Sequence, residues 1–104
     1  MIYRIRNIPE ARKEIKKAKE WYENQSIGLG DRFADEVKKA IRSLSSSKID
    51  HKLVFANNRR MLLPIFPYAV YYKRDENKYL VTIIAVLHNK QSLDRLLNRL
   101  VDEI

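Results

Sequence analysis

The second half of the chain contains three apolar runs that are rich in β-branched and aromatic residues, a composition typical of β-strands. They cover Met61–Phe66, Tyr68–Tyr72 and Tyr79–Leu87, and the polar sequence KRDEN separates the last two. A polar gap between two such runs predicts a β-hairpin. The last run, YLVTIIAVL, is apolar on both faces, so we expect a strand that is buried on both sides and forms the centre of the sheet.

The first half of the chain predicts a short strand followed by two amphipathic helices. Residues 2–8 alternate in the manner of a strand with one solvated face, and Pro9 suits the first position of a helix. A second helix begins at about Asp31, and two glycines in the preceding sequence SIGLG permit a tight connection. We expect an antiparallel helical hairpin with facing apolar stripes. The stripes are Ala11, Ile15, Ala18 and Tyr22, then Phe33, Val37, Ala40, Ile41 and Leu44.

Two further segments complete the predicted fold. The sequence LVFA at residues 53–56 is a short strand or an extension of the next one, and Ser92 can cap a terminal helix rich in leucine, which must pack on the sheet or on a partner. The predicted order is β-α-α-β-β-β-α. We therefore expect residues 1–104 to form a single α+β domain with helices packed on one face of a twisted, antiparallel-rich sheet.

The composition adds a strong positive charge. With 21 lysine and arginine residues against 13 acidic ones, the chain has a formal net charge of +8, which both halves share. A basic folded body attracts polyanions and acidic proteins. The chain contains no cysteine, and its N-terminal residues lack the apolar segment of a signal peptide. We therefore expect a cytoplasmic protein that is neither secreted nor embedded in a membrane.

Charged and titratable residues lie on either side of the apolar runs. Arg59 and Arg60 precede them, and His88 and Lys90 follow them. If the strands pair antiparallel, these groups can meet at one rim of the sheet. Adjacent arginines of a strand point to opposite faces, so only one of them can reach a shared site, where it binds a phosphate or forms a sheet-edge ion pair. His88 is either an ordinary strand-end histidine or a general acid or base.

Aromatic residues are the remaining candidates. Tyr68 and Tyr72 are core or rim residues, and a tyrosine that faces the basic rim can stack on a nucleic-acid base. Trp21 flanks the stripe of the first helix, and we expect it to pack in the core. The chain has no paired histidines at metal-ligand spacing, no glycine-rich phosphate loop and no nucleophile elbow. The sequence therefore predicts neither a metal site nor a cofactor.

Several stretches, taken together, resemble one family. They are AKEWYENQSIGLGDRFADEVKKAI, the arginine pair shortly before FPYAVYY, and VTIIAVLHNKQ. Over essentially its whole length the chain resembles the RelE/ParE superfamily of toxins from bacterial type II toxin–antitoxin modules, which are also called plasmid stabilisation proteins. It is most similar to the ParE branch. The resemblance implies a small α+β domain in which a helical hairpin packs on a twisted antiparallel sheet.

The resemblance implies one of two activities. RelE-like members are ribosome-dependent mRNA endonucleases with metal-free acid–base chemistry, in which Arg59 or Arg60 would bind the phosphate. His88 or Lys90 would then be the basic residue that ends the last strand. ParE-like members inhibit DNA gyrase and stall replication. The chain has no tyrosine after Tyr79, whereas many endonuclease members use a C-terminal aromatic residue. That departure and the stretch WYENQSIGLGDRF favour gyrase inhibition.

The resemblance also implies protein partners. A cognate antitoxin, usually encoded by an adjacent gene, wraps its C-terminal segment around such toxins in a hetero-oligomer. For this basic chain we expect an antitoxin that is acidic and partly disordered. The target is DNA gyrase, or the ribosome with mRNA in the RelE-like alternative; a third alternative is a binding module that has lost toxicity. The candidate partner-binding residues are Arg60, Tyr68, Tyr72, His88, Lys90, Leu96, Leu97 and Leu100.

Overall fold

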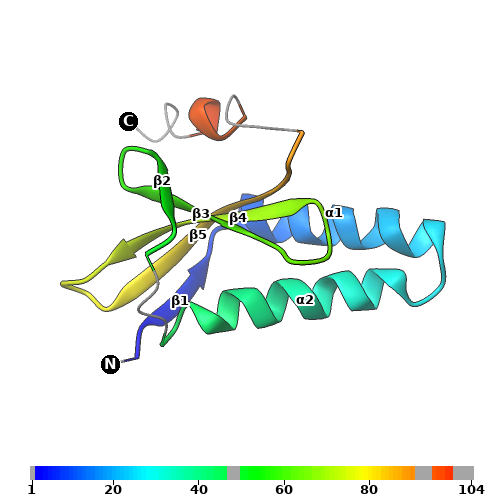
Figure 1. Cartoon of the computed structure of the whole chain (residues 1–104), viewed down its shortest axis with the longest axis horizontal. Helices are drawn as coiled ribbons and strands as arrows, with labels where there is room; N and C mark the ends of the chain where they lie inside the picture. The colour runs from blue at the N-terminus through cyan, green and yellow to red at the C-terminus, as the bar shows by residue number, and fades with distance from the viewer. Residues whose placement is uncertain (1, 47–49, 91–94, 100–104) are drawn as a thin grey trace.

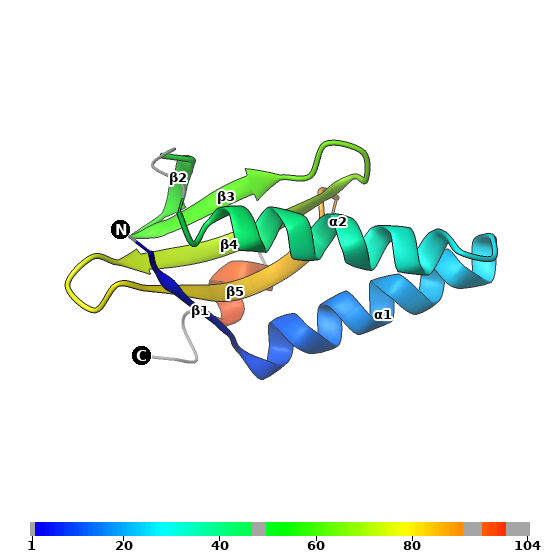
Figure 2. The ribbon, with the colours of Figure 1, turned by 90° about the horizontal axis from the view of Figure 1, so that it is seen from below.

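The computed structural model describes residues 2–46, 50–90 and 95–99. Within them, the helices α1 (Pro9–Gln25) and α2 (Leu29–Ser43) form an antiparallel hairpin against one face of a five-stranded sheet (Figures 1 and 2). Residues 95–99 are helical and lie on the other side of the sheet from α2 (Figure 1). The predicted α+β class and its helical hairpin are confirmed. The strands are β1 (Arg4–Asn7), β2 (Lys52–Phe55), β3 (Asn58–Leu62), β4 (Tyr68–Asp75) and β5 (Leu80–His88).

The sheet differs from the prediction in its centre and in its number of strands. Its order is β1-β5-β4-β3-β2, so β4 and not β5 is the central strand. β5 is still an interior strand, because β1 pairs with it in parallel on the side opposite to β4. Residues 83–87 of β5 are all buried, as its apolar run indicated. Residues 52–55 form a strand of their own, so four described strands follow the helices where the predicted order has three.

The strand predicted at Met61–Phe66 instead covers Asn58–Leu62. The proline residues 64 and 67 have no N–H group for a strand ladder, which explains why the strand ends before them. The predicted hairpin between β4 and β5 is confirmed by antiparallel pairing. It continues into the polar residues as far as Asp75, whose carboxylate accepts the main-chain N–H groups of Asn77 and Lys78 in the turn.

Glu23, near the end of α1, closes the helical hairpin. Its carboxylate accepts the main-chain N–H groups of Gly28 and Gly30 at 3.0–3.1 Å. These contacts cap the start of α2, which begins at Leu29, slightly before the predicted start. A Cβ atom at Gly30 would lie 2.5 Å from the carbonyl oxygen of Lys19. Only glycine therefore permits this close approach of the two helices.

An aromatic cluster fills the space between the hairpin and the sheet. Phe33 of α2 is fully buried, and its ring centroid lies 5.0–5.2 Å from those of Tyr22, Phe66 and Tyr68. Tyr22 brings α1 into the same cluster, and Tyr68 brings in the first residue of β4. The cluster therefore fixes the start of β4 against both helices. None of the helices in the described ranges is long and apolar enough to cross a membrane.

Candidate functional site

A hollow of about 710 Å³ lies beside α1, and the end of β5 and residues 95–99 complete its walls. We call it the α1 groove. Its size falls within the range of about 300–1,000 Å³ that is usual for binding pockets. Its lining combines cations with aromatic side chains and includes Lys13, Lys17, Trp21, Tyr68, His88 and Arg95. A second hollow, of about 500 Å³, also combines cations with an aromatic ring, Tyr71, but the α1 groove is larger and several aromatic side chains line it.

Trp21 is exposed at this groove, which corrects the prediction that it packs in the core. Its exposed fraction is 57%, and it touches the molecule through an edge contact with Tyr22, at a centroid distance of 5.1 Å. Tyr22 follows Ala18 by four positions and occupies the buried stripe, so the residue before it is rotated by about 100° toward solvent. An exposed tryptophan beside a hollow is a common mark of a contact surface.

Tyr68 and His88 form the end of the groove nearest the sheet. They are register partners across β4 and β5, and their rings meet edge to face at 5.2 Å. Burial raises the pKa of the Tyr68 phenol, so the phenol stays protonated near neutral pH. The Lys90 N–H donates to Nδ1 of His88 at 3.0 Å. The predicted pair of His88 and Lys90 is therefore a contact between a main-chain N–H and a ring nitrogen.

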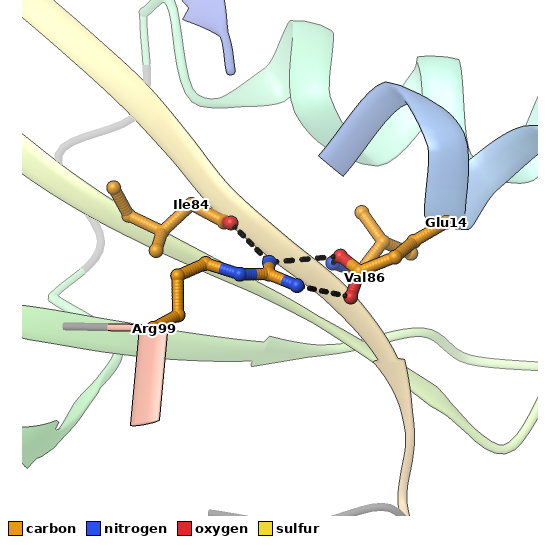
Figure 3. A network of polar contacts seen from close by, with 4 residues as sticks. All are labelled: Glu14, Ile84, Val86 and Arg99. Carbon is orange, nitrogen blue, oxygen red and sulfur yellow. Dashed lines mark hydrogen bonds and ion pairs between the residues drawn. The ribbon is translucent and has the colours of Figure 1, made fainter. Parts of the chain in front are cut away.

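A polar network links α1, β5 and residues 95–99 at the same groove (Figure 3). The Glu14 carboxylate accepts the Val86 N–H at 3.0 Å and pairs with the Arg99 guanidinium at 2.7 Å. Arg99 also donates to the Ile84 carbonyl at 2.8 Å. The Arg99 and Glu14 side chains are only 17% and 16% exposed. This network ties the segment at 95–99 to the edge of β5.

The structure does not bring the predicted rim residues together. Arg59 and Arg60 lie opposite Tyr72 and Tyr71 of β4, whereas His88 lies opposite Tyr68. Their partners on β4 are three and four residues from Tyr68, so the two arginines lie roughly 10–13 Å from His88 along the strands. They also lie about 10 Å from it across the strands, because β4 separates β3 from β5. The three side chains line three different hollows. Antiparallel pairing aligns the strands, but the register keeps these groups apart.

The predicted opposite orientation of the two arginines is confirmed. Tyr72 lies on the same face of β4 as Tyr68, because alternate residues of a strand share a face, and Tyr68 contacts the helices. Arg59 is opposite Tyr72 and therefore lies on the helix-covered face, where it donates to the His51 carbonyl at 2.6 Å. Arg60 is opposite Tyr71 and lies on the other face, which we call the open face.

A row of polar side chains crosses the open face. Lys52 of β2 is the register partner of Arg60, and Arg60 is the partner of Tyr71. With Asn89 they line a hollow of about 500 Å³ that also contains Leu53, Val54 and Leu62. The row offers two cations to an anion, but its lining includes neither a histidine nor a carboxylate.

Tyr72 is fully buried, so its side chain is not exposed for the predicted contact with a partner. Its hydroxyl lies 2.5 Å from Nδ1 of His51. Burial raises the pKa of the Tyr72 phenol, so the phenol donates and the neutral ring of His51 accepts. Burial lowers the pKa of His51, and the positive charges of Arg74 and Arg59 lower it further. His51 thus holds the segment before β2 against the sheet in its neutral form.

This arrangement predicts that acid destabilises the protein through His51. The folded pKa lies below the ordinary value of 6.5, so the unfolded chain binds more protons in the interval between them. The contribution of His51 is therefore present above pH 6.5 and is lost as the pH falls through the lowered value. Urea unfolding at a series of pH values should show this loss, and His51→Gln should flatten it. An unchanged slope in His51→Gln would contradict this assignment.

The predicted leucine contacts are described in part. Leu96 is fully buried, and Leu97 is half-buried. Leu100 and most of the predicted terminal helix lie outside the described residues. Leu96 therefore belongs to the packed interior of this structure. For this one leucine, packing within the domain is the outcome, and not exposure to a partner.

Comparison with protein families gives a match over most of the chain. The model of the ParE toxin of type II toxin–antitoxin systems matches residues 5–93. The chain belongs to the ParE toxin family. No curated protein sequence matches this ParE-family chain.

Solved structures of toxins share the fold of this ParE-family member. A chain of the chromosomal ParDE system from P. aeruginosa has a TM-score of 0.71 at 10% identity, and the match covers 84% of this chain and 96% of that one. A double mutant of E. coli RelE in the free state has a TM-score of 0.63 at 16% identity, with coverage of 100% and 99%. A chain of the RelBE2 toxin–antitoxin complex from Mycobacterium tuberculosis has a TM-score of 0.59 at 21% identity, with coverage of 85% and 92%.

Reasoning from sequence missed three residues of this ParE-family structure and misplaced a fourth, Trp21. Glu14 and Arg99 are 85 positions apart, and no local pattern connects them. Lys52 joins Arg60 only through the pairing of β2 with β3. A signal did exist for Trp21, because its position next to the stripe residue Tyr22 places it outside the stripe.

Proposed function

We propose that this ParE-family toxin acts in the bacterial cytoplasm by binding DNA gyrase and blocking replication, and that an acidic antitoxin neutralises it. The proposal rests on the wide separation of the candidate endonuclease residues in the structure. An acid–base endonuclease needs its proton donor or acceptor within hydrogen-bond reach of the group that reacts. Arg59, Arg60 and His88 line separate hollows, and the first two lie on opposite faces of the sheet. Binding to a protein target makes no such demand.

A RelE-like ribonuclease is the second candidate, because one observation favours it. The open-face row places the two cations Lys52 and Arg60 side by side on neighbouring strands, and the buried Tyr71 lies next to Arg60 on the third strand. Such a row can bind an RNA backbone. It lacks a histidine, and His88 lies on the helix-covered face of the sheet. The ribonuclease would therefore have to work without His88.

Two assays on the purified protein distinguish the candidates. We expect inhibition of gyrase supercoiling and no cleavage of mRNA on translating ribosomes. His88→Gln should leave gyrase inhibition within a small factor, because no proton transfer is required. In cells, induction should trigger DNA damage signalling and filamentation. Ribosome-dependent cleavage without an effect on gyrase would overturn the proposal, and an absence of any effect on growth would favour a non-toxic binding module.

Charge reversal on the open face supplies the control for the second candidate. Lys52→Glu combined with Arg60→Glu should abolish mRNA cleavage if that row binds RNA. Lys38→Glu combined with Lys39→Glu makes the same change of net charge on the exposed face of α2. A loss of cleavage with the first pair and not with the second would assign a ribonuclease to the open face.

A further inference from the structure

The turn that connects α1 and α2 projects beyond the sheet (Figures 1 and 2). Ile27 lies in this turn, and its side chain is 96% exposed, more than any other large apolar side chain of the described residues. Tight turns favour glycine, asparagine, aspartate and serine, which adopt the turn geometry or bond to nearby main-chain groups. Neither burial in the core nor the chemistry of the turn therefore accounts for an isoleucine here.

Hydrogen bonds hold this turn in one conformation. The Ser26 N–H donates to the Tyr22 carbonyl at 3.1 Å, and the Leu29 N–H donates to the Ser26 carbonyl at 3.0 Å. The Glu23 carboxylate binds the main chain just after Ile27, as described above. A side chain on an ordered turn loses little conformational freedom when a partner buries it. Ile27 is therefore well suited to enter an apolar pocket of another protein.

The outer half of the helical hairpin has the opposite charge to the rest of the chain. Residues 19–36 contain five carboxylates and two cations, so this segment carries −3. Because the whole chain carries +8, the other residues together carry +11. Glu20 of α1 and Asp35 of α2 are both exposed. We call this half of the hairpin, with Ile27 at its end, the hairpin tip.

The charge of the hairpin tip favours a partner with a basic surface. Proteins that act on DNA have such surfaces, because lysine and arginine bind the phosphates, and the target proposed above acts on DNA. The separation of charge within the toxin would also turn the tip toward a positive surface during approach. A second copy of the chain fits less well, because two chains of +8 repel each other and a contact between unlike surfaces does not close a dimer.

We propose that the hairpin tip is the part of the toxin that docks on DNA gyrase. Ile27 enters an apolar pocket of gyrase, and Glu20 and Asp35 face lysine and arginine residues around that pocket. This inference rests on the proposed inhibition of gyrase and adds the surface that makes the contact. It needs no residue of the open face.

Ile27→Ser tests the apolar part of the contact. Because Ile27 is almost fully exposed, the substitution should leave the midpoint of urea unfolding unchanged. We expect the toxin concentration that halves the supercoiling activity of purified gyrase to rise at least about tenfold. Ile65→Ser is the matched control, because Ile65 is also exposed but lies between β3 and β4. It should change that concentration by less than about twofold.

Glu20→Gln with Asp35→Asn tests the charged part. The two substitutions remove charge with little change of shape, so binding of gyrase to immobilised toxin should weaken at least about fivefold at low salt. Its dependence on salt should also become shallower. Glu10→Gln with Glu76→Gln removes the same charge from two exposed carboxylates outside the tip. This control pair should change binding by less than about twofold.

A photo-cross-linker locates the contact. The amino acid p-benzoylphenylalanine in place of Ile27 should join the toxin to gyrase on irradiation. The same group in place of Ile65 should not. Mass spectrometry of the cross-linked peptides should place the contact on a gyrase surface that is rich in lysine and arginine.

The docking of the tip is overturned if Ile27→Ser inhibits gyrase as strongly as the parent, or if Ile65→Ser loses as much inhibition. Equal weakening by the two pairs of charge-removing substitutions also overturns it, as does a cross-link from position 27 only to a second copy of the toxin. A parent protein that does not inhibit gyrase rejects the proposed function itself. Inhibition by the parent that Ile27→Ser retains in full rejects the tip alone.

Discussion

Glu14→Ala should lower the free energy of unfolding by about 3 kcal/mol, because it breaks a pair that is largely shielded from water. The substitution leaves the Arg99 guanidinium without this carboxylate and removes the acceptor of the Val86 N–H. Glu14→Gln keeps an oxygen acceptor and removes the charge, so its loss should be smaller. Urea unfolding followed by circular dichroism measures both variants.

An exposed ion pair provides the control for Glu14. Lys19 and Asp31 approach to 3.3 Å, but their side chains are 46% and 77% exposed. Asp31→Ala should therefore cost less than about 1 kcal/mol. If Glu14→Ala costs no more than Asp31→Ala, then the network at the edge of β5 does not stabilise the fold.

Phe33→Ala should cost about 3–5 kcal/mol, which is a large part of the total stability of a typical domain. Phe33 is fully buried and contacts the rings of Tyr22, Phe66 and Tyr68. Its removal leaves a cavity where the hairpin meets the sheet. The midpoints of thermal and urea unfolding should both fall sharply.

Ile65→Ala is the matched control for Phe33, because Ile65 is a large apolar residue that is 56% exposed. We expect it to change the free energy of unfolding by less than about 0.5 kcal/mol. Comparable losses for the two variants would show that the aromatic cluster is not the centre of the core.

Elements with strong local patterns could be predicted from the sequence. The buried residues Ala11, Ala18 and Tyr22 recur at helical spacing, so α1 and its packed face follow from the stripe. The run of β5 is apolar on both faces, and the strand is interior. Its exact place in the sheet was missed, because the parallel pairing with β1 joins segments that are distant in the sequence.

The candidate site was less predictable, because it depends on register and on contacts between distant residues. That Arg59 and Arg60 point to opposite faces follows from the geometry of any strand. Their separation from His88 depends on which residues of β4 they face, and composition does not encode that register. The contact of Glu14 with Arg99 likewise exists only after the sheet has formed.

The parallel pairing of β1 with β5 has a consequence for synthesis of the chain. Arg4–Asn7 leave the ribosome long before their partners at residues 80–83, which are more than 70 positions later in the chain. Closing so long a loop carries an entropic cost that the local hairpin of β4 and β5 avoids. During refolding, amides of β1 should therefore gain protection from hydrogen exchange after those of β4 and β5. A cell that makes this toxin therefore meets its complete sheet only after translation has passed residue 83.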